Sequence, residues 1–155
     1  MKHKLQTAAV AVLAAAVAVA APSAAKADII ITQDCRGWYP TGHAGVLLNP
    51  CVEADANDLG QGWYLKPYAY VTSPSTDVRV YIQTGTSANR TSPITWESAT
   101  TQSAVFGPNE YNQKWEANEQ IYDYFQGCNW TRVWATDGSA TFAWDIESPP
   151  ACYGV

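Results

Sequence analysis

The residues with the strongest chemical signal in this sequence are aromatic. Seven tryptophans occur in 155 residues, which is more than a core of this size requires. Exposed indole rings beside polar side chains can stack on sugar faces or anchor a protein partner. The strand pattern before the Asp137-Gly138 turn points Trp134 outward, and we expect Trp130 and Trp115 to lie beside it. These three tryptophans are the first candidates for a ligand-binding surface.

A second candidate surface is rich in tyrosine. In the stretch Trp63–Thr84, Tyr68 and Tyr81 alternate with aliphatic residues. We expect both tyrosine rings to lie on one face and to contribute to ligand binding. The same pattern would also arise from ordinary cross-strand pairs on a solvated sheet, with Arg79 above a ring in a cation–π contact.

The sequence contains no clear arrangement of catalytic residues. His43, the only histidine beyond residue 3, stands between Gly42 and Ala44 in an expected surface loop, and no Gly-x-Ser-x-Gly elbow accompanies it. The acidic stretch 53–60 lacks calcium-loop spacing, because Leu59 stands where a ligand belongs. Carboxylates are numerous, but no pair stands out for glycoside hydrolysis. We therefore predict that the protein is not an enzyme and has no catalytic residue, no metal and no cofactor.

The four cysteines are expected to form disulfide bonds. An even number of cysteines in an exported protein implies a disulfide framework, and four cysteines allow three connectivities. We favour Cys35–Cys51 with Cys128–Cys152, because each bond then joins neighbouring segments of the chain.

Residues 1–27 have the composition of a secretory signal peptide. A basic cluster around Lys2 precedes the small apolar run 8–21, and Ala25-Lys26-Ala27 matches the pattern that signal peptidase recognises. The apolar run is too short for a convincing membrane span. We expect cleavage before Asp28 and export from the cell.

The remaining residues 28–155 have the length of a single domain. The whole chain carries a net charge of −5, and loss of the basic signal peptide makes the balance more negative. A net negative charge disfavours nucleic acid and anionic membrane surfaces as partners. We expect a secreted, extracellular monomer that binds no nucleic acid and does not insert into membranes.

The elements that must position the candidate side chains are strands. Trp63–Thr84 alternates apolar and polar residues on both sides of a Pro/Ser turn, which is typical of two antiparallel strands. In the predicted hairpin, Val71 faces Val78 on the core side. Tyr68 meets Tyr81 on the opposite side.

A second hairpin is predicted around Asp137-Gly138, the preferred pair for a two-residue turn. Its register pairs Val133 with Phe142 and Ala135 with Ala140. With about seven short strands between turn residues, and no amphipathic helix, the chain predicts an all-β fold. The expected architecture is an antiparallel sandwich with an immunoglobulin-like arrangement and two disulfides.

Several short segments carry a resemblance to known proteins. They are the alanine-rich signal, Pro50-Cys51, Asp77–Gln83, Arg132–Ala135 and Ser148–Pro150. Together they resemble small exported β-sandwich proteins of actinobacteria, most of which have no assigned activity. A weaker similarity is to secreted α-amylase inhibitors of the tendamistat type, which are also all-β with two sequential disulfides. The first cysteine loop here encloses Trp38-Tyr39, but the Trp-Arg-Tyr triplet of those inhibitors is absent.

These observations favour a small secreted β-sandwich protein that serves as a non-catalytic binding module. Its surface aromatics would hold an extracellular carbohydrate or protein ligand. The alternative function is inhibition of a secreted hydrolase, such as an amylase or a protease. A platform of exposed rings would favour sugar binding, whereas a single protruding rigid loop would favour inhibition.

Overall fold

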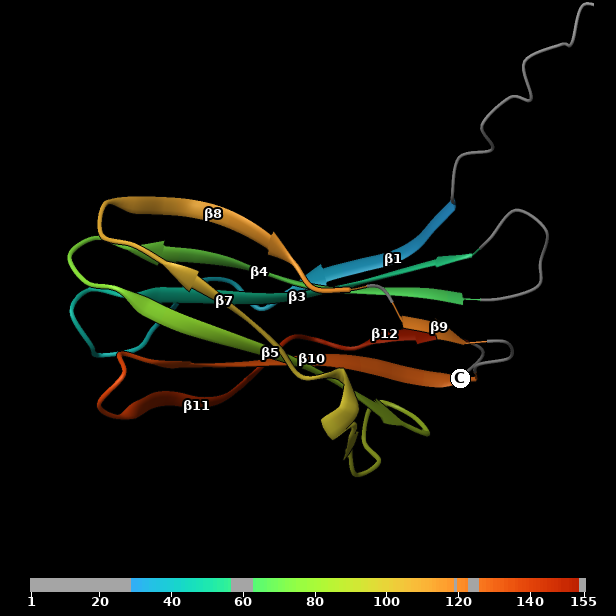
Figure 1. Ribbon diagram of the computed structural model, residues 1–155. Coiled ribbons are helices and arrows are strands. Elements are labelled where there is room, and N and C mark those ends of the chain that lie inside the picture. The colour runs from blue at the N-terminus through green and yellow to red at the C-terminus, as the bar shows by residue number, and fades with distance from the viewer. Residues whose placement is uncertain (1–28, 57–62, 119, 123–125, 154–155) are drawn as a thin grey trace, which may run out of the picture.

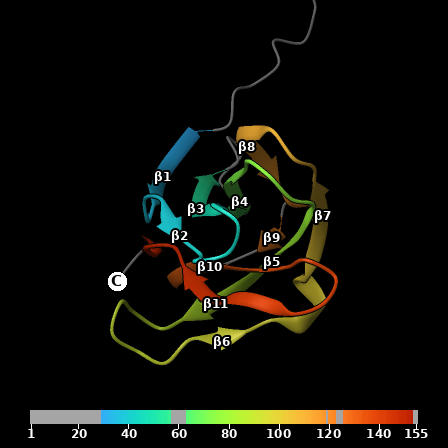
Figure 2. The same cartoon turned by 90° about the vertical axis from the view of Figure 1, so that its left-hand side faces the viewer.

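The computed structural model describes residues 29–56, 63–118, 120–122 and 126–153, and in these residues the fold is all-β. Two antiparallel sheets pack face to face, as the layers in Figure 1 and the end-on view in Figure 2 show. The predicted antiparallel sandwich is therefore confirmed. The described residues form twelve strands and one short 3-10 helix. This is more than the expected seven, since several strands are only two or three residues long.

The first sheet combines strands from the start of the described chain with two later ones. Its strands are β1 (Ile29–Cys35), β2 (Tyr39–Pro40), β3 (Leu47–Ala56), β4 (Trp63–Ser73), β8 (Glu110–Glu116) and β9 (Gln120–Tyr122). The main path runs β1-β3-β4-β8, while β2 pairs with β3 and β9 pairs with β4. The long strands β3 and β4 therefore form the centre of this sheet.

The second sheet is built around two long strands that are far apart in the sequence. Its strands are β5 (Val78–Ser87), β6 (Thr95–Trp96), β7 (Gln102–Phe106), β10 (Gly127–Thr136), β11 (Thr141–Glu147) and β12 (Ala151–Tyr153). The main path runs β11-β10-β5-β6, while β12 pairs with β10 and β7 pairs with β5. The helix η1 (Ser98–Thr100) connects β6 to β7.

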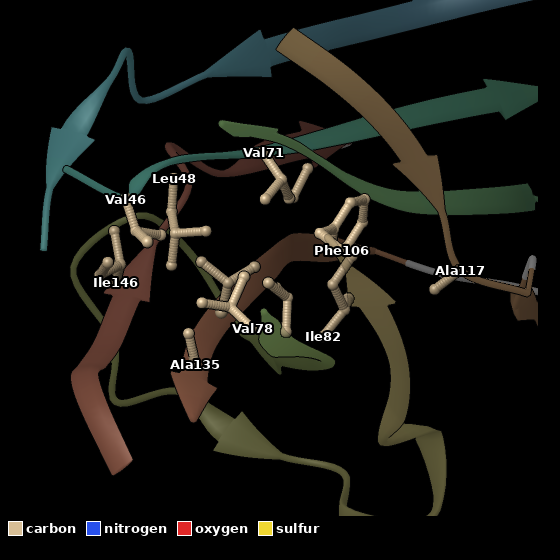
Figure 3. Close-up of a cluster of buried hydrophobic side chains, with 12 residues drawn as sticks. Val46, Leu48, Val71, Val78, Ile82, Phe106, Ala117, Ala135 and Ile146 are labelled. Carbon is tan, nitrogen blue, oxygen red and sulfur yellow. The ribbon is translucent and has the colours of Figure 1, made fainter. Parts of the chain in front are cut away.

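The core lies between the two sheets. Buried and partly exposed residues alternate over Thr131–Thr136 of β10 and over the first five residues of β5, as the period-two pattern requires for a sheet with one covered face. Leu48 and Val71 from the first sheet meet Val78 and Ile82 from the second, and each is at most 1% exposed (Figure 3). Burial of each such side chain contributes about 1.5–3 kcal/mol to stability.

The two strands in Trp63–Thr84 do not pair with each other, so the hairpin predicted there is wrong. Both strands exist, but β4 belongs to the first sheet and β5 to the second, so the chain crosses from one layer to the other between them. Val71 and Val78 do share the core. Tyr68 and Tyr81 instead belong to different sheets, so the single tyrosine face expected from the sequence does not exist.

The predicted register of the last hairpin is also wrong. Thr136 pairs with Thr141 and Ala135 with Phe142, so the turn between β10 and β11 has four residues, 137–140. The register then shifts between Val133 and Ala135. A four-residue turn forms because Asp137 organises it through its side chain, as described below.

Both disulfides have the predicted connectivity. Cys35–Cys51 joins β1 to β3, and Cys128–Cys152 joins β10 to β12. In each case the two cysteines are direct cross-strand partners, with Cα atoms 4.1 and 4.0 Å apart. The bonds therefore fasten one edge strand of each sheet to a central strand.

Candidate functional site

The outer face of the second sheet gathers the aromatic side chains that face away from the core. On β10, Val133 and Ala135 are completely buried, whereas Trp130, Arg132 and Trp134 alternate with them and are partly exposed. The outward direction predicted for Trp134 and Trp130 is therefore correct, although the predicted hairpin register is not. Strand alternation alone determines this direction.

Tyr81 on β5 lies directly opposite Trp134. Their rings are parallel to within 2°, and the ring centroids are 5.2 Å apart. Such a stacked cross-strand pair stabilises the sheet and holds both rings in one orientation. Tyr81 and Trp134 therefore form a rigid aromatic pair on this surface.

Arg132 connects this pair to a third ring. Its guanidinium carbon lies 4.5 Å from the ring centroid of Trp96 and 5.7 Å from that of Trp134. Its Nε donates a hydrogen bond to Oε1 of Gln83 (2.7 Å), and its Nη1 donates to Oδ1 of Asp145 (3.1 Å). We call Tyr81, Trp134, Arg132 and Trp96 the aromatic–arginine ladder.

Both flanks of the ladder are fixed by neighbouring residues. Trp96 lies on Gly85, whose missing side chain leaves space for the ring: a Cβ at Gly85 would come within 2.5 Å of Trp96 Cε3. Trp130 continues the same face and donates a hydrogen bond from Nε1 to Oγ of Ser87 (2.8 Å). The ladder is therefore ordered before any ligand binds.

An open hollow lies beside the ladder at the end of the sheet that holds the β10–β11 turn. Its lining is made of Arg79, Tyr81, Thr136, Gly138, Ser139, Ala140 and Thr141. Four of these residues carry hydroxyl groups, and one carries a guanidinium group. We call it the hydroxyl-lined hollow. Tyr81 belongs both to this hollow and to the ladder, so one ring of the stacked pair lines the hollow.

The turn that borders the hollow is organised by Asp137. Its Oδ1 accepts hydrogen bonds from Ser139 Oγ (2.7 Å), Ser139 N (2.8 Å) and Ala140 N (3.0 Å). These bonds, the one from Ser139 Oγ first, hold the pKa of the Asp137 carboxyl down at about 2, and His43 adds an attraction. Nε2 of His43 lies 3.1 Å from Oδ2, so the turn is also tied to the loop between β2 and β3.

We expect the Asp137 carboxyl to titrate near pH 2, below its ordinary value of 3.8. Because this pKa is lowered in the folded state, the carboxylate stabilises the turn fully above its ordinary value, and the contribution is lost as the pH falls through about 2. Carboxyl chemical shifts measured by NMR across an acid titration test this. Ser139→Ala should raise the pKa by removing the first donor. An ordinary value in the unmodified protein would show that these bonds do not form in solution.

Two of the predicted ligand-binding residues are not on the surface that was expected. Trp115 faces inward because it pairs with Ala69, and it packs against the core with its ring centroid 6.2 Å from that of Phe106. Tyr68 is 1% exposed. Its hydroxyl accepts a hydrogen bond from Gln33, and the Lys114 ammonium lies 4.5 Å from its ring centroid.

Two exposed aromatic residues were not expected at a ligand-binding surface. Trp38 is 44% exposed and Tyr39 is 39% exposed, in the loop closed by the first disulfide. Two neighbouring aromatics on an extended segment point to opposite sides, so at least one of them had to face outward. Trp96 and Arg132 were also missed. Their contact depends on the pairing of β6 with β5, which local sequence does not reveal.

Among the described residues, no group of three or more histidine, cysteine, aspartate or glutamate side chains is arranged to hold a metal ion. The described part of the chain also has no helix with the length and apolar character needed to cross a bilayer. Comparison of this chain with protein-family models, with curated proteins and with solved structures gives no match.

Proposed function

We propose that this protein is a secreted, non-catalytic binding module that takes a carbohydrate on the outer face of the second sheet. The observation that carries the proposal is that Tyr81, which lines the hydroxyl-lined hollow, is stacked on Trp134. An aromatic ring offers an apolar surface to the C–H groups of a sugar. Hydroxyl, guanidinium and backbone groups beside it exchange hydrogen bonds with the sugar hydroxyls.

The organisation of the ladder supports binding by a prebuilt surface. Trp134 has Tyr81 stacked on it and the Arg132 guanidinium nearby, so its orientation is fixed by its neighbours. A ligand that contacts Tyr81 therefore meets a side chain whose conformational freedom has already been restricted. Binding to such a surface loses less entropy than binding to mobile side chains.

A carbohydrate fits this face better than a protein does. Protein interfaces are enriched in aromatic residues and arginine but depleted of aspartate and serine. Here Asp145 lies on the face and accepts a hydrogen bond from Arg132, and Ser139 lines the hollow beside the rings. Polar groups between the rings suit a ligand that presents many hydroxyls.

Export from the cell is part of the same proposal. The two disulfides fit a protein that reaches an oxidising compartment. The signal-like segment 1–27 lies outside the described residues, so it supports export only by its composition. Binding of a sugar by stacked rings and hydrogen-bonding groups, as proposed here, requires no cofactor.

Replacement of Tyr81 with alanine should weaken carbohydrate binding by about tenfold or more, because an aromatic anchor at a binding site typically contributes more than 1 kcal/mol. The ligand is first identified on a glycan array, and the affinity of each variant for that glycan is then measured by isothermal titration calorimetry. Trp134→Ala should weaken binding as well, since Tyr81 loses the ring that orients it.

The matched control for this prediction is Tyr111→Ala. Tyr111 is 57% exposed and lies on β8 of the opposite sheet. Its removal should leave the affinity unchanged. If the protein binds no glycan on the array, or if Tyr81→Ala binds as tightly as the unmodified chain, the proposed function is wrong.

A further inference from the structure

We propose that Trp38 forms a second, separate carbohydrate-binding site on the first sheet, so that the protein is bivalent. This inference shares the ligand class of the proposed function but depends on different residues. Its starting point is exposure: Trp38 keeps 44% of its surface in solvent, and the adjacent Tyr39 keeps 39%. A large apolar ring held in water forgoes the stabilisation that burial would give it. An exposed tryptophan beside a second aromatic ring is a feature of interaction sites.

The loop that presents Trp38 is fixed to β3. The N–H of Arg36 donates a hydrogen bond to the carbonyl oxygen of Pro50 (3.1 Å), and the N–H of Gly37 donates to Oδ1 of Asn49 (2.8 Å). Gly37 has a φ of +95°, a conformation that favours glycine. The first disulfide precedes this turn directly, and β2 follows it. The backbone that presents Trp38 is therefore held in place before a ligand arrives, which lowers the entropy lost on binding.

A second ring and several polar groups surround Trp38. The ring centroid of Tyr70 lies 6.5 Å away, and the two planes are inclined by 57°. Tyr70 has Asn49 as its neighbour on β3 and Lys114 as its neighbour on β8. Lys114 in turn forms an ion pair with Glu116. The aromatic surface is thus bordered by an amide, an ammonium group and a carboxylate, which together can donate and accept hydrogen bonds.

These surroundings favour a sugar over a protein at Trp38. A stable protein interface covers about 800 Å² on each partner, and its core is depleted of charge. Here the aromatic surface consists of Trp38 and the partly exposed Tyr70, and Lys114 of the Lys114–Glu116 pair lies beside Tyr70. One or two sugar rings match a patch of this size, while the charged groups suit their hydroxyls.

Trp38 directly precedes β2 of the first sheet, whereas Tyr81 and Trp134 belong to β5 and β10 of the second sheet; Figure 2 shows these strands. One molecule can therefore hold two polysaccharide chains, or two segments of one chain, at the same time. When one site is occupied, the other is kept at a high effective concentration near the polymer, so binding to a polymer is tighter than binding to a short oligosaccharide. A bivalent monomer can also cross-link a soluble polysaccharide.

The inference is tested by co-sedimentation of the full protein with amorphous cellulose, chitin and insoluble starch. The variants are Trp38→Ala, Tyr81→Ala, the double variant and the control Tyr153→Ala, whose side chain is 45% exposed. Trp38→Ala should weaken binding to the best-bound polymer by about tenfold or more, and Trp38→Phe should recover part of this loss. Tyr153→Ala should bind as the unmodified protein does. The double variant should lose binding, and equal melting temperatures show that the variants are folded.

The outcomes separate the two sites. If Trp38→Ala binds every polymer as tightly as the unmodified chain, the proposal of a second site is wrong. The proposed function is then tested by Tyr81→Ala alone. If only Trp38→Ala weakens binding, the second site is supported and the first is wrong. An amylase and protease inhibition panel gives the remaining test. If the protein inhibits one of these enzymes and Trp38→Ala abolishes the inhibition, the loop docks on a protein and the inference is wrong. Absence of binding to all three polymers also overturns the inference.

Discussion

Replacement of Cys128 and Cys152 with serine should lower the free energy of unfolding by about 3 kcal/mol. The bond closes a segment with a sequence separation of 24, and its removal increases the conformational freedom of the unfolded chain. The short strand β12 is paired with β10 over three residues, and this bond lies at the middle pair. Chemical denaturation of the purified variant, monitored by tryptophan fluorescence, measures the loss.

The first disulfide provides a control for this denaturation measurement. Cys35 and Cys51 have a sequence separation of 16, so their replacement should give a loss of similar size within a few tenths of a kcal/mol. Adding reductant to either variant should remove the contribution of the remaining bond. If the Cys128/Cys152 variant unfolds at the same denaturant concentration as the oxidised protein, the proposed stabilisation by this bond is wrong.

Replacement of Gly85 with alanine should destabilise the protein by about 1–3 kcal/mol or more, the cost of overpacking a filled site. The added Cβ would come within 2.5 Å of Trp96 and 2.7 Å of Ile94, so both side chains must move. Displacement of Trp96 also takes the aromatic ring away from Arg132. Thermal and chemical unfolding measure the stability, and glycan binding should weaken as the ladder is disturbed.

Gly107→Ala is the matched control for Gly85→Ala. At Gly107 the nearest atom to an added Cβ is Oδ1 of Asp77 at 3.6 Å, an ordinary contact. This change should therefore leave the stability nearly unaltered. Equal losses in the two variants would mean that the position of Trp96 over the strand does not cause the effect.

The features that depend on local pattern could be predicted from the sequence. Period-two alternation identified β4, β5 and β10, and it gave the outward direction of Trp134 correctly. The order of the four cysteines favoured the connectivity that the structure has. The all-β class followed from short alternating segments between turn residues. These properties need only the residues of one segment, or the spacing of a few.

The features that depend on distant pairing could not be predicted. Alternation shows which residues of β4 and β5 are buried, but it does not show whether the two strands pair with each other or face each other across the core. In the structure β4 pairs with β3 and β8, while β5 pairs with β10 and β7. Tyr68 and Tyr81 therefore belong to different sheets. The inward direction of Trp115 and the contact of Trp96 with Arg132 likewise follow from long-range pairing.

The last hairpin shows a different reason for failure. Asp-Gly favours a two-residue turn, but Asp137 uses one side-chain oxygen to accept bonds from Ser139 and Ala140. This Asx-type arrangement competes with the backbone preference and produces a four-residue turn. Positive φ values at Ala143 and Asp145 then accompany the irregular pairing of β11. Such side-chain bonds are compatible with the sequence, but they are not specified by the Asp-Gly pair alone.

The crossing of the chain between β4 and β5 has a consequence for how the protein folds. Each sheet combines early and late strands of the chain. The first sheet contains β1 to β4 together with β8 and β9, and the second contains β5 to β7 together with β10 to β12. The core takes residues from both halves of the chain, so large loops must close before the core is complete. Topologies of this kind fold on the scale of milliseconds to seconds rather than microseconds. The sandwich should therefore form in one cooperative step once the whole chain is present, and a fragment that ends after β5 should remain unfolded.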